Sequence, residues 1–277
     1  MILRRFVKHV TEQNWFAVGL DMLVVVTGIF LGMQVTDWND ERNEQLQIEQ
    51  YLSALENDLQ QDAEMLIPVA EQIDLRGTKG RMLAKHIKDI PLHQLSNLDL
   101  FLFTTSPGYR PYSWNRATLD QLKNSGAIRK ITSPELIKKI SDYDALSRHL
   151  DLDYTNDEQY MHEAFSLAIK IIDMNYPNSR ELVREANRNI VNANTRIQDG
   201  PLYKKALSNN TVLLTQDLPS IRAMANVYKE ISQTLSSRTS HEIPRLKKYG
   251  QEIIELIHQH YPITGSTNSV MHKKETP

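Results

Sequence analysis

The residues best suited to bind a ligand lie together in one proline-containing segment. Within eight positions the chain offers aromatic rings that could stack on a sugar and arginines that could hold an anion. This candidate ligand-binding set is Tyr109, Arg110, Tyr112, Trp114, Asn115 and Arg116. In the alternative interpretation, the rings pack on the domain and the arginines cap helix ends. We favour packing, and the sequence leaves the binding site open.

Other segments resemble catalytic or metal-binding motifs, but each lacks residues that its motif needs. His162-Glu163 has no second histidine for a zinc helix. Residues 151–158 are rich in acids, but a calcium loop starting at Asp151 would have Asn156 in place of its glycine and His162 in place of its final glutamate, so we expect a solvated helix face or a helix junction there. Residues 77–80 do not have the spacing of a phosphate-binding loop. The sequence therefore predicts no enzyme activity, no cofactor and no metal.

The chain has a long apolar segment near its N-terminus. Residues 15–35 carry one formal charge, Asp21, and a helix of this length crosses a bilayer core of about 30 Å. Trp15 and Trp38 would lie about 34 Å apart along such a helix, one in each interfacial belt. We therefore expect a membrane-spanning helix over residues 15–36.

One face of this helix is suited to contact another helix. Gly28 and Gly32 have the G-x-x-x-G spacing that lets two helix backbones approach closely. At 100° per residue they share a stripe with an acid, and the predicted contact face is Asp21, Val25, Gly28, Gly32 and Val35. The alternative is that small residues are simply common in membrane helices.

The rest of the chain has the pattern of one all-α domain. Apolar residues recur at helical spacing, glycines number only ten, and alternating β-branched runs are missing. A stem helix is expected over residues 37–76, continuing the membrane helix. Residues 77–262 should form the remainder of an antiparallel helical bundle, and the polar tail over residues 263–277 should be disordered.

The stem carries a heptad seam. Its positions alternate in steps of four and three, with one acid among apolar residues: Ile48, Leu52, Leu55, Leu59, Asp62, Leu66, Val69 and Ile73. The seam could pair with a second copy as a coiled coil or face helices of the same chain. We favour the bundle, because the later helices also need an apolar partner.

Several helix boundaries are marked by local signals. The glycines of residues 76–80 should break the stem, and Gly126 should end a helix that begins near Ala117. Ser133 and Pro134 have the N-cap and first-turn types that open a helix. Pro244 should interrupt the last long helix.

Two motifs resemble those of a family of uncharacterised bacterial single-pass membrane proteins, a domain of unknown function. The first is the acid-led apolar run of residues 21–28, followed by Gln34 and Trp38-Asn39-Asp40. The second lies within residues 118–131, where leucine, a Ser-Gly pair and isoleucine follow one another in the order of the family motif L-x-x-S-G-x-L-x-x-I. The helix that opens at Pro134 comes directly after it. The resemblance covers about the first half of the chain. Leu20 and Gly32 depart from the family pattern, which has glycine and alanine there. It implies a topology and no catalytic residues.

Charge around the apolar segment predicts its orientation. The leader of residues 1–14 has a net charge of +2, whereas residues 37–44 have a net charge of −3. Lysine and arginine favour the cytoplasmic side, so the leader should be cytoplasmic. No alanine occurs between Ala17 and Ala54, so a signal-peptide cleavage site is not expected. In a bacterium the chain would be an inner-membrane protein with a periplasmic C-terminal domain.

These features favour a noncatalytic role. We expect a membrane-anchored interaction or scaffold module of the bacterial envelope, whose partners are the bilayer and either a second copy or another membrane protein. The alternative is an extracytoplasmic ligand sensor that uses the Tyr109–Arg116 segment and signals through a partner membrane helix. The net charge of −2 argues against nucleic-acid binding.

Overall fold

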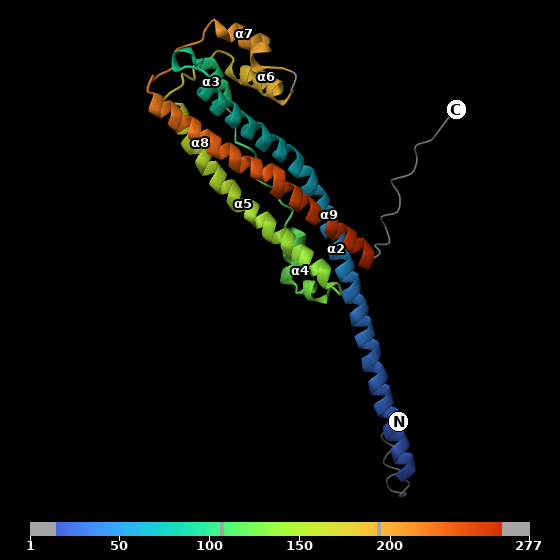
Figure 1. Ribbon diagram of the computed structural model, residues 1–277. Helices are drawn as coiled ribbons and strands as arrows, with labels where there is room; N and C mark the ends of the chain where they lie inside the picture. The colour runs from blue at the N-terminus through green and yellow to red at the C-terminus, as the bar shows by residue number, and fades with distance from the viewer. Residues whose placement is uncertain (1–14, 106–107, 193–194, 262–277) are drawn as a thin grey trace, which may run out of the picture. The chain divides into compact units, whose positions relative to one another are not determined.

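The protein is all-helical. The computed structural model describes residues 15–105, 108–192 and 195–261, and it contains 82% helix with no strand in that part of the chain (Figure 1). The all-α class predicted above is therefore confirmed. The predictions for the leader, residues 1–14, and for the tail, residues 263–277, lie outside the described residues.

The chain divides after Ala54 into two units, the second of which runs from Leu55 to Pro262. One helix, α2 (Trp15–Asp89), contributes to both units. The other α-helices all belong to the second unit: α3 (Asn97–Thr104), α4 (Ala117–Asn124), α5 (Pro134–Ala168), α6 (Ser179–Val191), α7 (Pro201–Leu207), α8 (Leu218–Ser237) and α9 (Ile243–His260).

In the first unit, the described residues form only the N-terminal part of α2. This is the one helix in the described chain that is long and apolar enough to cross a membrane, and none of its most apolar window is buried. The positions of Gly28 and Gly32 are open, because a Cβ atom added at either would meet no neighbouring atom within 4 Å. Thr36 Oγ1 donates a hydrogen bond to the Gly32 carbonyl oxygen at 3.0 Å, as an internal helix contact.

The predicted break at residues 76–80 is wrong, because α2 continues through both glycines to Asp89. Gly80 lies against α8, where an added Cβ would stand 2.7 Å from the Tyr228 carbonyl oxygen. Gly77 lies one turn earlier, with the Ser232 carbonyl oxygen 3.6 Å from its Cβ position. The two glycines therefore allow two helices to approach closely and do not end the stem.

Three long helical segments form the core of the second unit: α2 from Leu55 onward, α5, and α8 continuing into α9. Six seam residues of α2 are at most 3% exposed within this single chain: Leu55, Leu59, Asp62, Leu66, Val69 and Ile73. Their burial within one chain agrees with the bundle interpretation of the seam.

The bundle is only partly antiparallel. Tyr143 of α5 contacts Asp62 of α2, and Asp157, further along α5, lies close enough to act electrostatically on Arg76. The residue order along both helices shows that α5 runs in the same direction as α2. In contrast, Arg238, which directly follows α8, pairs with Asp157, whereas Glu252 of α9 pairs with Lys139 near the start of α5. The two pairs show that the chain from α8 into α9 runs against α5.

Thr105 and residues 108–116, which lie outside the helices, make this parallel pairing possible, and we call them the strap. It returns along α2 from the far end of the stem. Its contacts move steadily backward along the stem: Thr105 O accepts from Lys79 Nζ at 2.9 Å, Arg110 N donates to Gln72 Oε1 at 3.0 Å, and Asn115 N donates to Asp62 Oδ1 at 3.0 Å. Because the strap returns the chain from the level of Lys79 to that of Asp62, α5 can run alongside α2. The predicted antiparallel bundle is therefore only partly observed, because no pattern in the sequence indicated this returning segment.

Local signals in the sequence define the ends of α4 and α5 well. Helix α4 ends at Asn124, and Gly126 adopts the left-handed conformation with φ 76°, as its type predicts. Ser133 Oγ accepts a hydrogen bond from Leu136 N, and Pro134 occupies the first turn of α5. Both boundaries were predicted from the sequence and are confirmed.

Pro244 does not separate α8 from α9. A π-helical turn, Arg238–Glu242, joins the two helices, and Pro244 lies in the first turn of α9. Proline has no N–H, so Pro244 cannot donate a hydrogen bond to the preceding turn. That turn is the wider π-helical one, and the helix continues through it. The wider turn contains Arg238, which is buried.

Candidate functional site

The strap brings the predicted ligand-binding residues against α5. Tyr109 is 2% exposed, and its hydroxyl donates a hydrogen bond to Asp157 Oδ2 at 2.7 Å. Its ring also meets the Tyr154 ring edge-on, with 5.2 Å between centroids. Burial raises the pKa of Tyr109 above its ordinary value, and the nearby Asp157 carboxylate adds to this shift. Tyr109 is thus a neutral hydrogen-bond donor inside the domain.

Tyr112 and Trp114 stack on each other. Their ring centroids are 5.0 Å apart and their planes differ by 15°. Tyr112 is buried, whereas Trp114 is half-buried and donates from Nε1 to Asp151 Oδ1 at 2.7 Å. The Tyr112 hydroxyl has no hydrogen-bond partner within the described residues. Both rings therefore lie on the bundle, as the packing interpretation expects.

The polar end of the strap also bonds within the protein. Arg116 Nη2 lies 2.6 Å from Asp151 Oδ2, on the carboxylate that also accepts from Trp114. The Asn115 backbone and side chain both donate to Asp62 Oδ1. Arg110 differs from the others, because its side chain is exposed. The structure therefore brings the six candidate residues together on one segment, but it gives five of them internal packing or hydrogen-bonding contacts through their side chains.

A second polar cluster lies at the π-helical turn. Arg238 Nη1 is 2.9 Å from Asp153 Oδ2 and 2.7 Å from Glu242 Oε1, and Arg238 Nε is 3.3 Å from Asp157 Oδ2. Burial of the guanidinium opposes its charge, but the pKa of Arg238 is raised by Asp157 and Glu242. The expected solvated face over residues 151–158 is thus wrong for Asp153 and Asp157, which are buried because they pair with this arginine.

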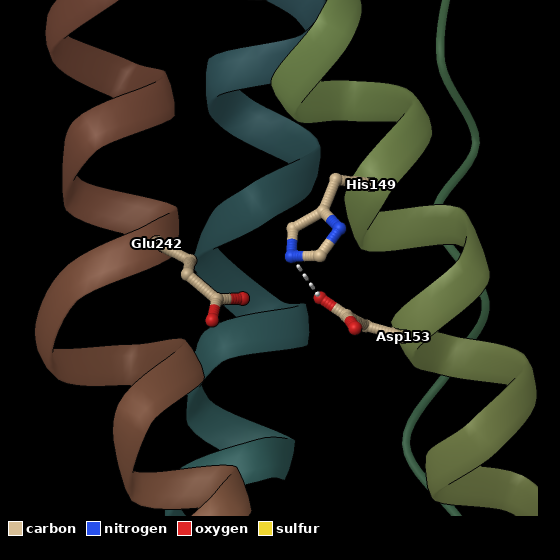
Figure 2. Close-up of side chains that lie close together, drawn as sticks. All are labelled: His149, Asp153 and Glu242. Atoms are coloured by element: carbon tan, nitrogen blue, oxygen red, sulfur yellow. Dashed lines mark ion pairs between the residues drawn. The ribbon is translucent and has the colours of Figure 1, made fainter.

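Three residues of this region have the types and positions of metal ligands. Figure 2 shows His149 and Asp153 on successive turns of α5, with Glu242 directed toward them from the π-helical turn. One ligand atom from each lies within 4.8 Å of the others. Two of the three ligands are carboxylates that already pair with Arg238. A bound cation would lie beside the guanidinium charge, so the geometry favours an ion-pair network over a metal centre.

The sequence contained part of the signal for this cluster. His149, Asp153 and Asp157 recur every four residues and must share one face of a helix. Their partner Arg238 lies on a distant helix, and no spacing in the sequence connects it with them. The sequence therefore marks the acidic segment but not the arginine that pairs with it in the interior.

No protein-family model, no curated protein and no solved structure matches this chain. The resemblance to a family of uncharacterised membrane proteins thus stays a prediction.

Proposed function

We propose that this chain is a single-pass protein of the bacterial inner membrane, with its N-terminus in the cytoplasm and its helical unit in the periplasm. It acts there as a noncatalytic interaction or scaffold module. The observation that carries this proposal is the exposed apolar part of α2 at the N-terminal end of a domain with its own buried core.

The exposed apolar side chains support a membrane anchor. Those from Leu20 to Val35 include Leu23, Ile29 and Phe30, which are 63%, 61% and 59% exposed. Each large aliphatic or aromatic side chain gains about 1.5–3 kcal/mol when it leaves water for an apolar environment. A soluble protein would rarely leave such a continuous apolar surface open. The charge difference across the segment supports the proposed orientation.

The internal pairing of polar residues supports a noncatalytic role. Asp62, Asp153, Asp157 and Arg238 are all buried, and each bonds to another group of the same domain. Such groups hold helices in register and are less suited to act on a substrate. The proposed partner surface is instead the stripe of Asp21, Val25, Gly28, Gly32 and Val35, which would bind a second copy or another membrane helix.

The topology can be tested with single cysteines, because the chain contains none of its own. Thr11→Cys labels the leader, and Ser141→Cys labels an exposed position on α5. In intact spheroplasts a membrane-impermeant maleimide should modify Ser141→Cys at once and Thr11→Cys only after permeabilisation. Labelling of Thr11→Cys alone before permeabilisation would reverse the topology. Equal labelling of both in a soluble fraction would reject the anchor.

The interaction role needs its own measurement. Crosslinking of the full-length chain in its native membrane should yield a defined species larger than the monomer, identified by mass spectrometry as a homodimer or a complex with one other membrane protein. Recovery of the monomer alone, under conditions that crosslink a known membrane dimer, would contradict an interaction module.

A further inference from the structure

A surface hollow of about 450 Å³ lies where α3, α5 and α6 meet. Its apolar lining comes from Phe101, Phe165 and Val183. Phe165 is 44% exposed, which is unusual for a phenylalanine near the end of a well-packed helix. The size and the aromatic lining are both in the range of small-molecule sites.

Two arginines line the same hollow. Arg180 and Arg184 lie one turn apart on α6, so their side chains project from the same face. Both are exposed, and neither forms an ion pair with any carboxylate in the described part of the chain. Two guanidinium groups at this spacing present planar sets of donors that match one carboxylate.

A third cation lies directly behind the hollow. Lys79 of α2 is 1% exposed, and its ammonium donates to Thr105 O at 2.9 Å and to Asn187 Oδ1 at 3.0 Å. Thr105 and Asn187 both line the hollow. No carboxylate among the residues that the structure describes forms an ion pair with Lys79. A buried ammonium without a counter-ion is costly, so an anion bound nearby would be favoured.

We propose that this hollow binds a small organic anion, with its carboxylate between Arg180 and Arg184 and its apolar body against Phe101 and Phe165. Positive charge comes from α6 at the rim and, below about pH 7 where its amine is protonated, from Lys79 behind the lining. The apolar lining requires that the ligand carry a hydrocarbon or aromatic body as well as a charge. This site does not depend on the scaffold role proposed above.

The test is calorimetric titration of the full-length protein in lipid nanodiscs with benzoate, 4-phenylbutyrate and hexanoate. At least one of these anions should bind saturably at one site. Acetate, which lacks the apolar body, and 4-phenylbutanol, which lacks the charge, should bind at least tenfold more weakly. Empty nanodiscs give the partition background. Absence of saturable binding by all three anions up to about 10 mM would overturn the proposal.

Matched variants on α6 locate the site. Arg184→Glu should weaken binding by about tenfold or more, because it replaces a charge-assisted contact by a repulsion. Arg188→Glu makes the same charge change one turn further along α6, outside the lining of the hollow, and should leave the affinity within about twofold. Phe165→Ser removes an exposed ring and should also weaken binding. Equal weakening by Arg184→Glu and Arg188→Glu would mean a diffuse charge effect and reject the site.

Discussion

Tyr143 of α5 donates a hydrogen bond of 2.8 Å to Asp62 Oδ2 on α2. Asp62 is the one acid in a seam that is otherwise apolar, and it is 3% exposed. Its second oxygen accepts from the strap, at Asn115 N and Nδ2. The irregular position in the heptad is thus the point where the stem, the strap and α5 are joined.

Replacing this acid distinguishes an intramolecular bundle from an intermolecular coiled coil. In the bundle, Asp62→Leu leaves the Tyr143 hydroxyl and the Asn115 N–H without their acceptor, at about 1–3 kcal/mol for each buried group. We therefore expect a lower thermal midpoint for the full-length protein. In a coiled coil, leucine would complete the seam and raise the midpoint in a concentration-dependent way. Tyr143→Phe, which removes one bond only, should have a smaller effect than Asp62→Leu.

The two stem glycines should respond in opposite directions to alanine. In Gly80→Ala the new Cβ would stand 2.7 Å from the Tyr228 carbonyl oxygen, so α2 or α8 must shift, at about 1–3 kcal/mol. In Gly77→Ala the nearest atom is the flexible end of Arg81, at 3.4 Å. The alanine therefore fits and should stabilise the helix by about 0.5–1 kcal/mol. Thermal unfolding of both variants checks this, and similar destabilisation by both would contradict the close approach at Gly80.

Lys79 should make stability depend on pH. Burial, together with the positive charge of Arg76, lowers the pKa of Lys79 from its ordinary value to about 7. Between about pH 7 and pH 10 the unfolded chain keeps the lysine proton that the folded chain has lost, so the free energy of unfolding should rise with pH. Below pH 7 both states hold the proton and this contribution no longer changes.

The neutral variant Lys79→Met isolates that contribution. The unfolding midpoints of the wild type and of Lys79→Met should be measured at pH 6, 7.5 and 9. All other titratable groups are the same in the two proteins, so the difference between their midpoints reports on Lys79. The wild type should gain stability relative to Lys79→Met as the pH rises through this range. Parallel curves would show that the lysine keeps an ordinary pKa in the folded protein.

Substitution of the small residues in the membrane segment tests the proposed pairing face. Gly28→Ile combined with Gly32→Ile adds bulk on that stripe and should weaken crosslinking between chains in membranes. Gly19→Ile is the control, because Gly19 lies nine residues before Gly28 and half a turn round the helix at about 100° per residue. Unchanged crosslinking in the double variant would reject the stripe as a contact face.

Much of the helical structure follows from local signals, whereas its assembly does not. The cap at Ser133 and the left-handed Gly126 depend only on neighbouring residues, so the sequence predicts them. Gly77 and Gly80 have the same residue type as a helix break, but contact with α8 decides their role. The candidate binding residues lie together on one segment, but their partners Asp151 and Asp157 lie on a helix whose direction the sequence did not reveal. Distant contacts of this kind leave no local pattern.

The arrangement of the stem also affects how the chain matures during its synthesis. Asp62 is synthesised 81 residues before its partner Tyr143. The Leu59 side chain lies 3.8 Å from the Cβ position of Gly250, which belongs to the last helix, α9. At about 5–20 residues per second, synthesis of the intervening chain takes on the order of ten seconds or more. During that time the apolar seam is made but not yet covered. A nascent stem of this kind is a natural client for a holding chaperone, and its release should follow the emergence of α9.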